Sequence, residues 1–260
     1  MSGGPEIRIL KDLEEVGREA SEFFAWVVGQ AMNARGSARV ALSGGSTPKA
    51  LFTALTNPAS ARTVRWSQVE FYFGDERCVP PEHPESNFGL ANQALFKPLN
   101  IVSSQIVRIE GERARPEETA RDYEGQIRQR FSVSPPAVPK FDLILLGLGD
   151  DGHTASLFPD TPALQEGRRL VVPNQAPRGV RDRITFTVTL INQADTILFI
   201  VSGGGKAEAV RAVLEDKDQR PDRFPARLIR PVSGRAVWFL DQEAASKLRL
   251  VTQAGDSNEE

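Results

Sequence analysis

A glycine-rich segment carrying two acids and a histidine, GLGDDGH at residues 147–153, directly follows the apolar run at 141–146. In α/β proteins ligands bind beyond the carboxyl ends of the strands, which is where this segment is expected to lie. An imidazole takes up and releases a proton readily near neutral pH, and a neighbouring carboxylate can orient it. We therefore expect His153 to act in acid–base catalysis, with Asp151 orienting its ring and Asp150 as the alternative.

The same segment has the glycine spacing of a dinucleotide-binding turn, because Gly147, Gly149 and Gly152 match G-x-G-x-x-G. That turn offers backbone N–H groups to a pyrophosphate, and two adjacent aspartates would repel this dianion. The next predicted strand, RRLVVP at 168–173, also lacks the acidic residue that would bind a ribose. We expect no nucleotide cofactor.

A second glycine-rich segment, SGGSTP at 43–48, follows the predicted strand at 39–42. Its glycines allow a ligand to approach the backbone, its hydroxyls can donate hydrogen bonds, and Thr47-Pro48 is typical of a helix start. These features favour a small phosphate cradle, although a tight turn without a ligand is the alternative. The cradle would consist of Ser43, Gly44, Gly45, Ser46 and Thr47.

Two further segments follow predicted strands and carry a cation. In GDER at 74–77, Arg77 could hold a phosphate or a carboxylate, while Asp75 and Glu76 could instead be helix caps or its ion-pair partners. In SGGGK at 202–206, Lys206 suits a monophosphate, or it is simply exposed at a helix end. Alanine at 207 occupies the position where a nucleoside triphosphatase needs its magnesium-binding hydroxyl, so nucleoside triphosphate is excluded.

Composition excludes several other classes of protein. There is no G-x-S-x-G nucleophile elbow, and Cys78, the single cysteine, has only a loop histidine, His83, near it in sequence. Two histidines and one cysteine make a transition-metal site improbable, and no cofactor or metal is expected.

Charge and hydropathy bear on partners and on location. The net charge of −2 gives no reason to expect nucleic acid as a partner, and no apolar run approaches the ~20 residues that span a bilayer. The start, MSGGPEIRIL, lacks the basic and apolar regions of a signal peptide, and one cysteine allows no internal disulfide. We expect a cytoplasmic enzyme.

Hydrophobic periodicity predicts the elements that must position these segments. Strands alternate with helices, which indicates an α/β fold with a mostly parallel sheet and helices on both faces. Residues 185–201 hold two strands with little between them, so we expect one domain over 1–260, with an antiparallel insertion or small subdomain around 168–195. The segments at 74–77 and 220–225 are expected to be loops, and 254–260 a frayed acidic tail. The predicted strands are 7–10, 39–42, 69–73, 141–146, 170–172, 184–190, 196–201 and 236–240, and the main predicted helices are 13–31, 86–96, 116–131 and 207–214.

Five segments taken together resemble the 6-phosphogluconolactonase family, which is grouped with glucosamine-6-phosphate deaminase and resembles ribose-5-phosphate isomerase. The resemblance implies a modified Rossmann-like three-layer sandwich. It also implies hydrolysis of 6-phosphoglucono-δ-lactone to 6-phosphogluconate, the second step of the oxidative pentose phosphate pathway. The segments are ALSGGSTPKALF at 41–52, FGDERCVPPEHPESNFGLANQALF at 73–96, FDLILLGLGDDGHTASLFP at 141–159, RITFTV at 183–188 and VSGGGKAEAV at 201–210.

The nearest alternative within this resemblance is the deaminase. Deaminases have a glutamate five residues after the histidine, and this chain has Phe158 there, which cannot transfer a proton. Arg77 and the Ser86-Asn87 pair also follow the lactonase pattern. An alternative from another class is a non-catalytic sugar-phosphate sensor.

The resemblance implies a role for each candidate residue. His153 would take a proton from water and return one to the ring oxygen, while loop 43–47 would bind the phosphate with Lys206 and Arg183 adding charge. Arg77 would bind the phosphate or polarise the carbonyl, Asn87 would contact sugar hydroxyls, and Asp75 would belong to the substrate-binding set. The partner is then a small sugar-phosphate lactone, and we expect a monomer.

Overall fold

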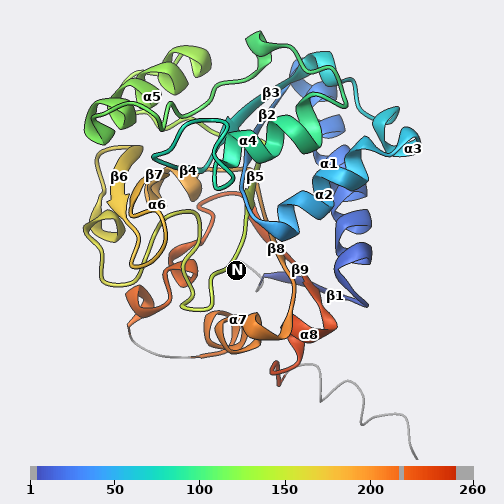
Figure 1. The fold of residues 1–260 in the computed structure, drawn as a ribbon. Coiled ribbons are helices and arrows are strands. Elements are labelled where there is room, and N and C mark those ends of the chain that lie inside the picture. The colour runs from blue at the N-terminus through green and yellow to red at the C-terminus, as the bar shows by residue number, and fades with distance from the viewer. Residues whose placement is uncertain (1–4, 217–219, 250–260) are drawn as a thin grey trace, which may run out of the picture.

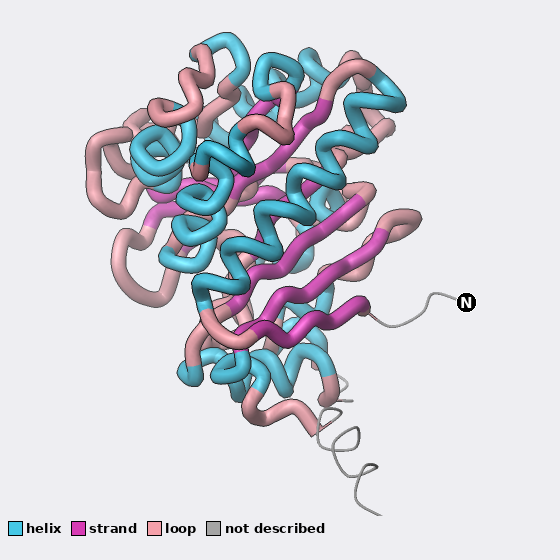
Figure 2. Tube along the Cα trace, turned by 90° about the vertical axis from the view of Figure 1, so that its right-hand side faces the viewer, coloured by secondary structure: helices cyan, strands magenta, loops and turns pink. Residues whose placement is uncertain are grey.

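The computed structural model describes residues 5–216 and 220–249. A parallel sheet of six strands runs through the centre in the order β1-β9-β8-β5-β2-β3, as Figures 1 and 2 show. The predicted α/β fold with a mostly parallel sheet is confirmed. The strands are β1 (Glu6–Leu10), β2 (Ala38–Leu42), β3 (Val69–Phe73), β5 (Leu143–Leu146), β8 (Thr196–Val201) and β9 (Arg235–Asp241).

Helices cover both faces of this sheet because side chains on each strand alternate in direction. On β3, Phe71 packs against Phe96 on the face covered by α1 (Leu13–Arg35) and α2 (Ser46–Thr56). The next residue, Tyr72, packs on the opposite face against Phe131 at the end of α5 (Pro116–Phe131). Helix α7 (Ala207–Leu214) follows β8. The shorter helices are α3 (Pro58–Ala61), α4 (Asn87–Ala91), α6 (Val188–Ile191) and α8 (Gln242–Ala245).

Helix α1 illustrates how sequence signals set the ends of an element. Asp12 caps its first turn by accepting a hydrogen bond of 2.9 Å from the Glu15 N–H, and the helix ends at Gly36, whose φ of 79° favours glycine. The helix predicted over 86–96 divides in two: α4 continues as a π-helical turn over Asn92–Phe96.

A small antiparallel sheet stands beside the main one and contains β4 (Asp75–Arg77), β7 (Asp182–Phe186) and β6 (Val171–Gln175). The prediction of a loop at 74–77 is wrong. Residues 75–77 pair with β7, which lies more than 100 residues later in the sequence, and this pairing makes them a strand. The strand predicted over 184–190 ends at Phe186, where Thr187 caps α6.

Two other expectations concern the last third of the chain. Residues 220–225, expected to be a surface loop, form 3₁₀ turns at Pro221–Arg223 and Pro225–Leu228, and Pro225 is buried. The expected tail at 254–260 lies outside the described residues.

The order of the strands creates a crevice at the carboxyl edge of the sheet. From β2 the chain moves outward to β3, then returns to β5 on the other side of β2. Such a switch point is where α/β sheets open to bind ligands. The loops that follow β2 and β5 border this crevice, and the loops after β3 and β8 lie next to them.

No helix within the described ranges is both long and apolar enough to cross a bilayer.

Candidate active site

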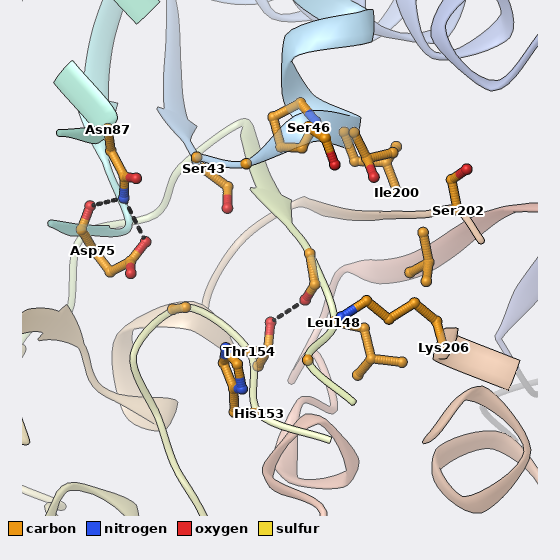
Figure 3. A pocket seen from close by; sticks show the side chains of 18 of the residues that line it. Ser43, Ser46, Asp75, Asn87, Leu148, His153, Thr154, Ile200, Ser202 and Lys206 are labelled. Carbon is orange, nitrogen blue, oxygen red and sulfur yellow. Dashed lines mark hydrogen bonds between the residues drawn. The ribbon is translucent and has the colours of Figure 1, made fainter. Parts of the chain in front are cut away.

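The four loops identified in the sequence meet in one cavity of about 250 Å³ at the switch point (Figure 3). An adjoining pocket of about 710 Å³ shares Asp75, Arg77 and His153 with it, and Asp151 and Arg183 line only this second pocket. All the expected site residues therefore line one or the other. The first cavity collects Ser43, Gly44, Gly45, Ser46, Thr47, Asp75, Arg77, Asn87, His153 and Lys206.

His153 lies in a tight turn after β5 and is held by the acid that precedes it by two residues. Asp151 Oδ1 lies 2.6 Å from His153 Nδ1 and also accepts a 3.0 Å hydrogen bond from the His153 backbone N–H. Two neighbouring backbone bonds close the turn, from Gly149 N–H to His153 O at 2.8 Å and from Gly152 N–H to Gly149 O at 3.0 Å. Of the two candidate acids, the one in contact with the imidazole is Asp151.

Glycine is required at two positions of this turn. A Cβ on Gly149 would lie 2.0 Å from His153 Nδ1, so any side chain there would displace the imidazole. Gly152 has a φ of 77°, in the left-handed region that favours glycine. The G-x-G-x-x-G spacing that resembles a nucleotide turn thus makes room for the imidazole.

The Asp151 carboxylate is ionised when it holds His153. Partial burial opposes its charge, but the hydrogen bonds from His153 and the attraction to its ring outweigh burial and lower the pKa of Asp151. With Nδ1–H donated to this carboxylate, a neutral imidazole carries its free lone pair on Nε2. The His153 side chain is 32% exposed, so that lone pair is accessible from the cavity.

One face of the imidazole packs against an aromatic ring. The ring centroids of His153 and Phe158 lie 4.7 Å apart, and Phe158 is buried. Phe158 occupies the position at which the sequence comparison placed the glutamate of deaminases. Here that position supplies an apolar surface and no proton-transferring group.

The other acid of the pair, Asp150, points to a different partner. Its Oδ1 accepts a 3.1 Å hydrogen bond from Lys206 Nζ, and its side chain is 77% exposed. Lys206 lines the first cavity (Figure 3) while it is paired with this exposed acid.

The glycine-rich loop that carries Lys206 uses its backbone donors within the protein. Gly203 N–H donates to both oxygens of Asp241, at 3.0 and 2.9 Å, and Gly204 N–H donates to Glu243 at 3.2 Å. Ser202 Oγ also bonds to Asp241. The Gly203 and Gly204 N–H groups are therefore engaged within the protein, and the Lys206 side chain lines the cavity.

The loop after β2 presents the start of a helix to the cavity. Helix α2 begins at Ser46, and its cap is Gly45, with a φ of 107° and no side-chain cap. The Thr47-Pro48 helix start expected from the sequence is therefore two residues too late. The first intrahelical bond of this turn runs from the Lys49 N–H to Gly45 O at 3.2 Å, so the N–H groups of Ser46 and Thr47 have no acceptor within the helix.

Gly44 leaves room for a neighbouring side chain and also lines the cavity. A Cβ at this position would lie 1.8 Å from Asn87 Oδ1, so the Asn87 amide occupies the space that the glycine leaves. Asn87 in turn donates from Nδ2 to Asp75 Oδ1 at 3.1 Å and to Asp75 O at 2.9 Å (Figure 3).

Asp75 and Glu76 are buried acids that position other groups. Asp75 Oδ2 accepts a 2.7 Å hydrogen bond from Ser156 Oγ, so both of its carboxylate oxygens have partners. Glu76 accepts from the backbone N–H groups of Asn87 and Phe88, both at 2.8 Å, and so caps α4. Burial raises the pKa of Glu76, and the hydrogen bonds from the backbone, which lower it, only partly offset this effect. Of the alternatives left open by the sequence, a cap is correct for Glu76.

Arg77 and Arg183 lie directly opposite each other in the antiparallel pair of β4 and β7. Arg77 Nη1 donates to the Glu85 carbonyl at 2.6 Å, and Arg183 Nε donates to the Val180 carbonyl at 2.8 Å. The sequence left the position of Arg183 open, and antiparallel pairing brings it to the site. It does not, however, line the cavity formed by loop 43–47 and Lys206.

Cys78 and His83 form no reactive pair. Burial, followed by the charges of Asp182 and Glu76, raises the pKa of the Cys78 thiol to about 11. His83 Nδ1 accepts a hydrogen bond of 3.1 Å from the Glu85 N–H. The thiol is protonated at neutral pH and is therefore a poor nucleophile.

Sequence reasoning did not single out Ser156 or Thr154. Ser156 holds Asp75, while Thr154 Oγ1 donates to the Gly147 carbonyl at 2.8 Å and ties the histidine turn to the end of β5. Both hydroxyls are buried directly after His153, and this proximity in sequence was the signal available.

The whole chain, and not only its site, is similar to known proteins. The chain is 38% identical over 245 residues to a 6-phosphogluconolactonase of Synechocystis sp., covering 94% of this chain and 99% of the relative. It is 38% identical over 252 residues to the 6-phosphogluconolactonase of Homo sapiens, covering 95% and 93% of the two chains.

Solved structures with the same architecture include a 6-phosphogluconolactonase from Trypanosoma cruzi. Its TM-score is 0.84 at 28% identity, with 96% of this chain and 98% of that chain covered. A monomeric glucosamine-6-phosphate deaminase shares the fold, with a TM-score of 0.77 at 23% identity, over 93% and 99% of the two chains. The family model described as glucosamine-6-phosphate isomerases/6-phosphogluconolactonase matches residues 11–238, and the chain therefore belongs to that family.

Proposed function

We propose that this protein hydrolyses 6-phosphoglucono-δ-lactone to 6-phosphogluconate, the second step of the oxidative pentose phosphate pathway. The observation that carries the proposal is the Asp151–His153 pair, whose 2.6 Å hydrogen bond leaves an imidazole nitrogen free beside a cavity that also contains a helix start and a lysine. A δ-lactone is an activated ester. Its hydrolysis needs a positioned water, a base and stabilisation of the charge that develops on the carbonyl oxygen.

The phosphate lies at the start of α2 in this proposal. The N–H groups of Ser46 and Thr47, the hydroxyls of loop 43–47 and the positive end of the helix dipole favour an anion. Lys206 adds a charge once the phosphate replaces Asp150 as its partner. Binding the phosphate fixes the distant carbonyl near His153, which contributes to the rate through proximity.

Proton transfer runs through His153 Nε2. Nε2 takes a proton from the attacking water as its oxygen bonds to C1, and Asp151 stabilises the imidazolium that forms. The C1–O5 bond then breaks, the ring oxygen receives the proton from Nε2, and the new carboxylic acid loses its own proton to solvent. Acid–base help of this kind contributes ~10²–10⁴-fold to the rate.

Two parallel assays test the proposal. In the first, lactone is generated in situ and its disappearance is compared with spontaneous opening; in the second, ammonia release from glucosamine 6-phosphate is measured. We expect strong acceleration in the first assay and none in the second, because Phe158 replaces the proton-transferring glutamate. Ammonia release without lactone hydrolysis would contradict the proposal, and binding without either reaction would indicate a sensor. A cytoplasmic location and a monomeric state remain part of the proposal, which fractionation and light scattering would test.

A further inference from the structure

Two arginines lie side by side at the edge of the site, and neither forms an ion pair in the described part of the chain. Arg77 and Arg183 are cross-strand partners in β4 and β7, so their side chains leave the same face of the small sheet. Arg183 is 7% exposed, and Arg77 Nε is buried without a hydrogen-bond partner in the described part of the chain. Two like charges side by side, one buried and the other half-buried, are destabilising unless an anion joins them.

The acids around this arginine pair have other partners or lie beyond ion-pair distance. Both oxygens of Asp75 accept hydrogen bonds, from Ser156 and Asn87, and Glu76 caps α4. Within the described ranges, neither guanidinium forms an ion pair with Asp75, Glu76 or Glu85, the acids whose charges act on Arg183. Burial and the charge of Arg77 lower the pKa of Arg183, as expected for a cation without its own anion.

The arginine pair and the phosphate loop belong to different ends of the combined site. Arg183 lines the second pocket together with Asp151 and His153, whereas loop 43–47 and Lys206 line only the first cavity. His153 and Arg77 line both. If the phosphate of a ligand lies in the first cavity, the other end of the ligand extends past His153 toward the arginine pair. The carbon that reacts beside His153 is then also the carbon next to the two arginines.

We infer that Arg77 and Arg183 form a carboxylate-binding pocket that recognises C1 of an aldonate phosphate, the acid product of the reaction. The inference rests on the proposed function for the identity of this ligand. The lactone has one anionic group and the product has two, a phosphate and a carboxylate at opposite ends of the carbon chain. Guanidinium groups bind carboxylates through paired, charge-assisted hydrogen bonds, and the same pair would stabilise the developing charge on the carbonyl oxygen during attack.

This arrangement makes the protein selective for sugar acids over neutral sugar phosphates. The product then binds more tightly than an otherwise identical molecule without the C1 carboxylate, and it inhibits the enzyme as it accumulates. Charge-assisted hydrogen bonds of this kind correspond to a preference of roughly 10-fold or more.

Calorimetric titration with two probes tests the inference. The probes are 6-phosphogluconate and glucitol 6-phosphate, which share the phosphate and hydroxyl groups and differ in the charge at C1. The wild-type protein should prefer 6-phosphogluconate by roughly 10-fold or more. Arg183→Gln and Arg77→Gln should reduce this ratio toward one while leaving glucitol 6-phosphate affinity within about 2-fold.

Two control variants separate this role from phosphate binding and from general charge. Lys206→Ala should lower the affinity for both probes by the same factor, because both carry the phosphate. Arg181→Gln, an exposed arginine two residues from Arg183, should change neither. Circular dichroism checks folding. If Arg183→Gln does not fold, Arg183→Lys, which keeps the charge but loses the paired geometry, and Arg77→Gln decide the question.

Equal affinities of the wild-type protein for both probes would overturn the inference. An equal loss of affinity for both probes in Arg183→Gln would overturn it as well, because that result would mean that Arg183 binds the phosphate that the two probes share. Neither titration requires turnover, so failure of the carboxylate pocket can be distinguished from failure of the proposed reaction. A preference for 6-phosphogluconate without lactone hydrolysis would contradict only the reaction, and hydrolysis without that preference would contradict only the carboxylate pocket.

Discussion

Asp151 and His153 are hydrogen-bonded to each other through their side chains, at 2.6 Å, although a single residue separates them in the chain. Side chains two residues apart on a helix point in different directions, and the contact forms here because residues 149–152 make a tight turn. The acid and the imidazole are therefore oriented by the same short segment, at the switch point of the sheet. The adjacent Asp150 points instead to Lys206, which gives two neighbouring acids different partners.

Replacing Asp151 by asparagine should reduce kcat by roughly 10²-fold or more with a small change in KM. The amide keeps the size of the side chain but loses the charge that stabilises the imidazolium and fixes its tautomer. Steady-state kinetics of lactone hydrolysis measure both parameters. An unchanged kcat would show that His153 needs no carboxylate partner.

Replacing Asp150 by asparagine should affect substrate binding and not the chemical step. We expect an unchanged kcat and a KM that is lower by up to about 5-fold. The exposed Asp150 carboxylate competes with the phosphate for Lys206, so its removal frees the lysine for the ligand. A KM that rises in Asp150→Asn would mean that the acid positions Lys206 for binding, contrary to this account.

Gly149→Ala should yield a folded protein with a strongly reduced kcat, by roughly 10²-fold. The added Cβ would lie 2.0 Å from His153 Nδ1 and 2.7 Å from Asp151 Oδ1, so the imidazole must leave its position. The matched control is Gly125→Ala in α5, where a Cβ meets nothing within 4 Å; it should retain full activity and gain a little thermal stability. If both variants kept full activity, the observed position of the imidazole would not be the one that matters for catalysis.

The thiol of Cys78 should be unreactive in the folded protein. Its pKa of about 11 leaves roughly 300-fold less thiolate at neutral pH than a free cysteine with a pKa of about 8.5. Because burial favours the neutral thiol, alkylation of the native protein should stay slow at neutral pH, rise with pH until it levels off above about 11, and become fast when the protein unfolds. Mass spectrometry of iodoacetamide labelling across this pH range measures the effect, and Cys78→Ser should keep full lactonase activity. Rapid labelling of the native protein at pH 7.5 would be inconsistent with a buried, protonated thiol.

The sequence was a good guide wherever function depends on local patterns. Four polar loops after predicted strands were expected at one edge of the sheet, and β8, β5, β2 and β3 are adjacent in the order that brings them together. The parallel alternation of strands and helices is a sufficient reason, because the carboxyl ends of parallel strands lie at the same edge.

Contacts between segments that are distant in the sequence could not be predicted from local sequence patterns. Arg77 and Arg183 are 106 residues apart, and only the antiparallel pairing of β4 with β7 places them opposite each other. The segment at 74–77 has no strand pattern of its own, so its strand is induced by the partner. The contact between Gly44 and Asn87, 43 residues away in the chain, was likewise not predictable from the local pattern.

Where two neighbouring residues could have the same role, only the backbone geometry shows which of them has it. The sequence allowed Asp150 or Asp151 to orient His153, and their carboxylates diverge because the turn closes at Gly149 and Gly152. At the start of α2, the threonine-proline signal pointed to a cap at Thr47, whereas the observed cap is Gly45, with a positive φ, two residues earlier.

The central claim is that His153 is the base of a lactone hydrolase. The most direct measurement compares lactone hydrolysis by the wild-type protein and by His153→Ala with the uncatalysed rate, using lactone generated in situ. We expect the wild-type protein to accelerate hydrolysis strongly, and His153→Ala to lose at least ~10²-fold in kcat with little change in KM. Near-normal turnover by a folded His153→Ala protein would contradict the account and move the base to another group of the cavity.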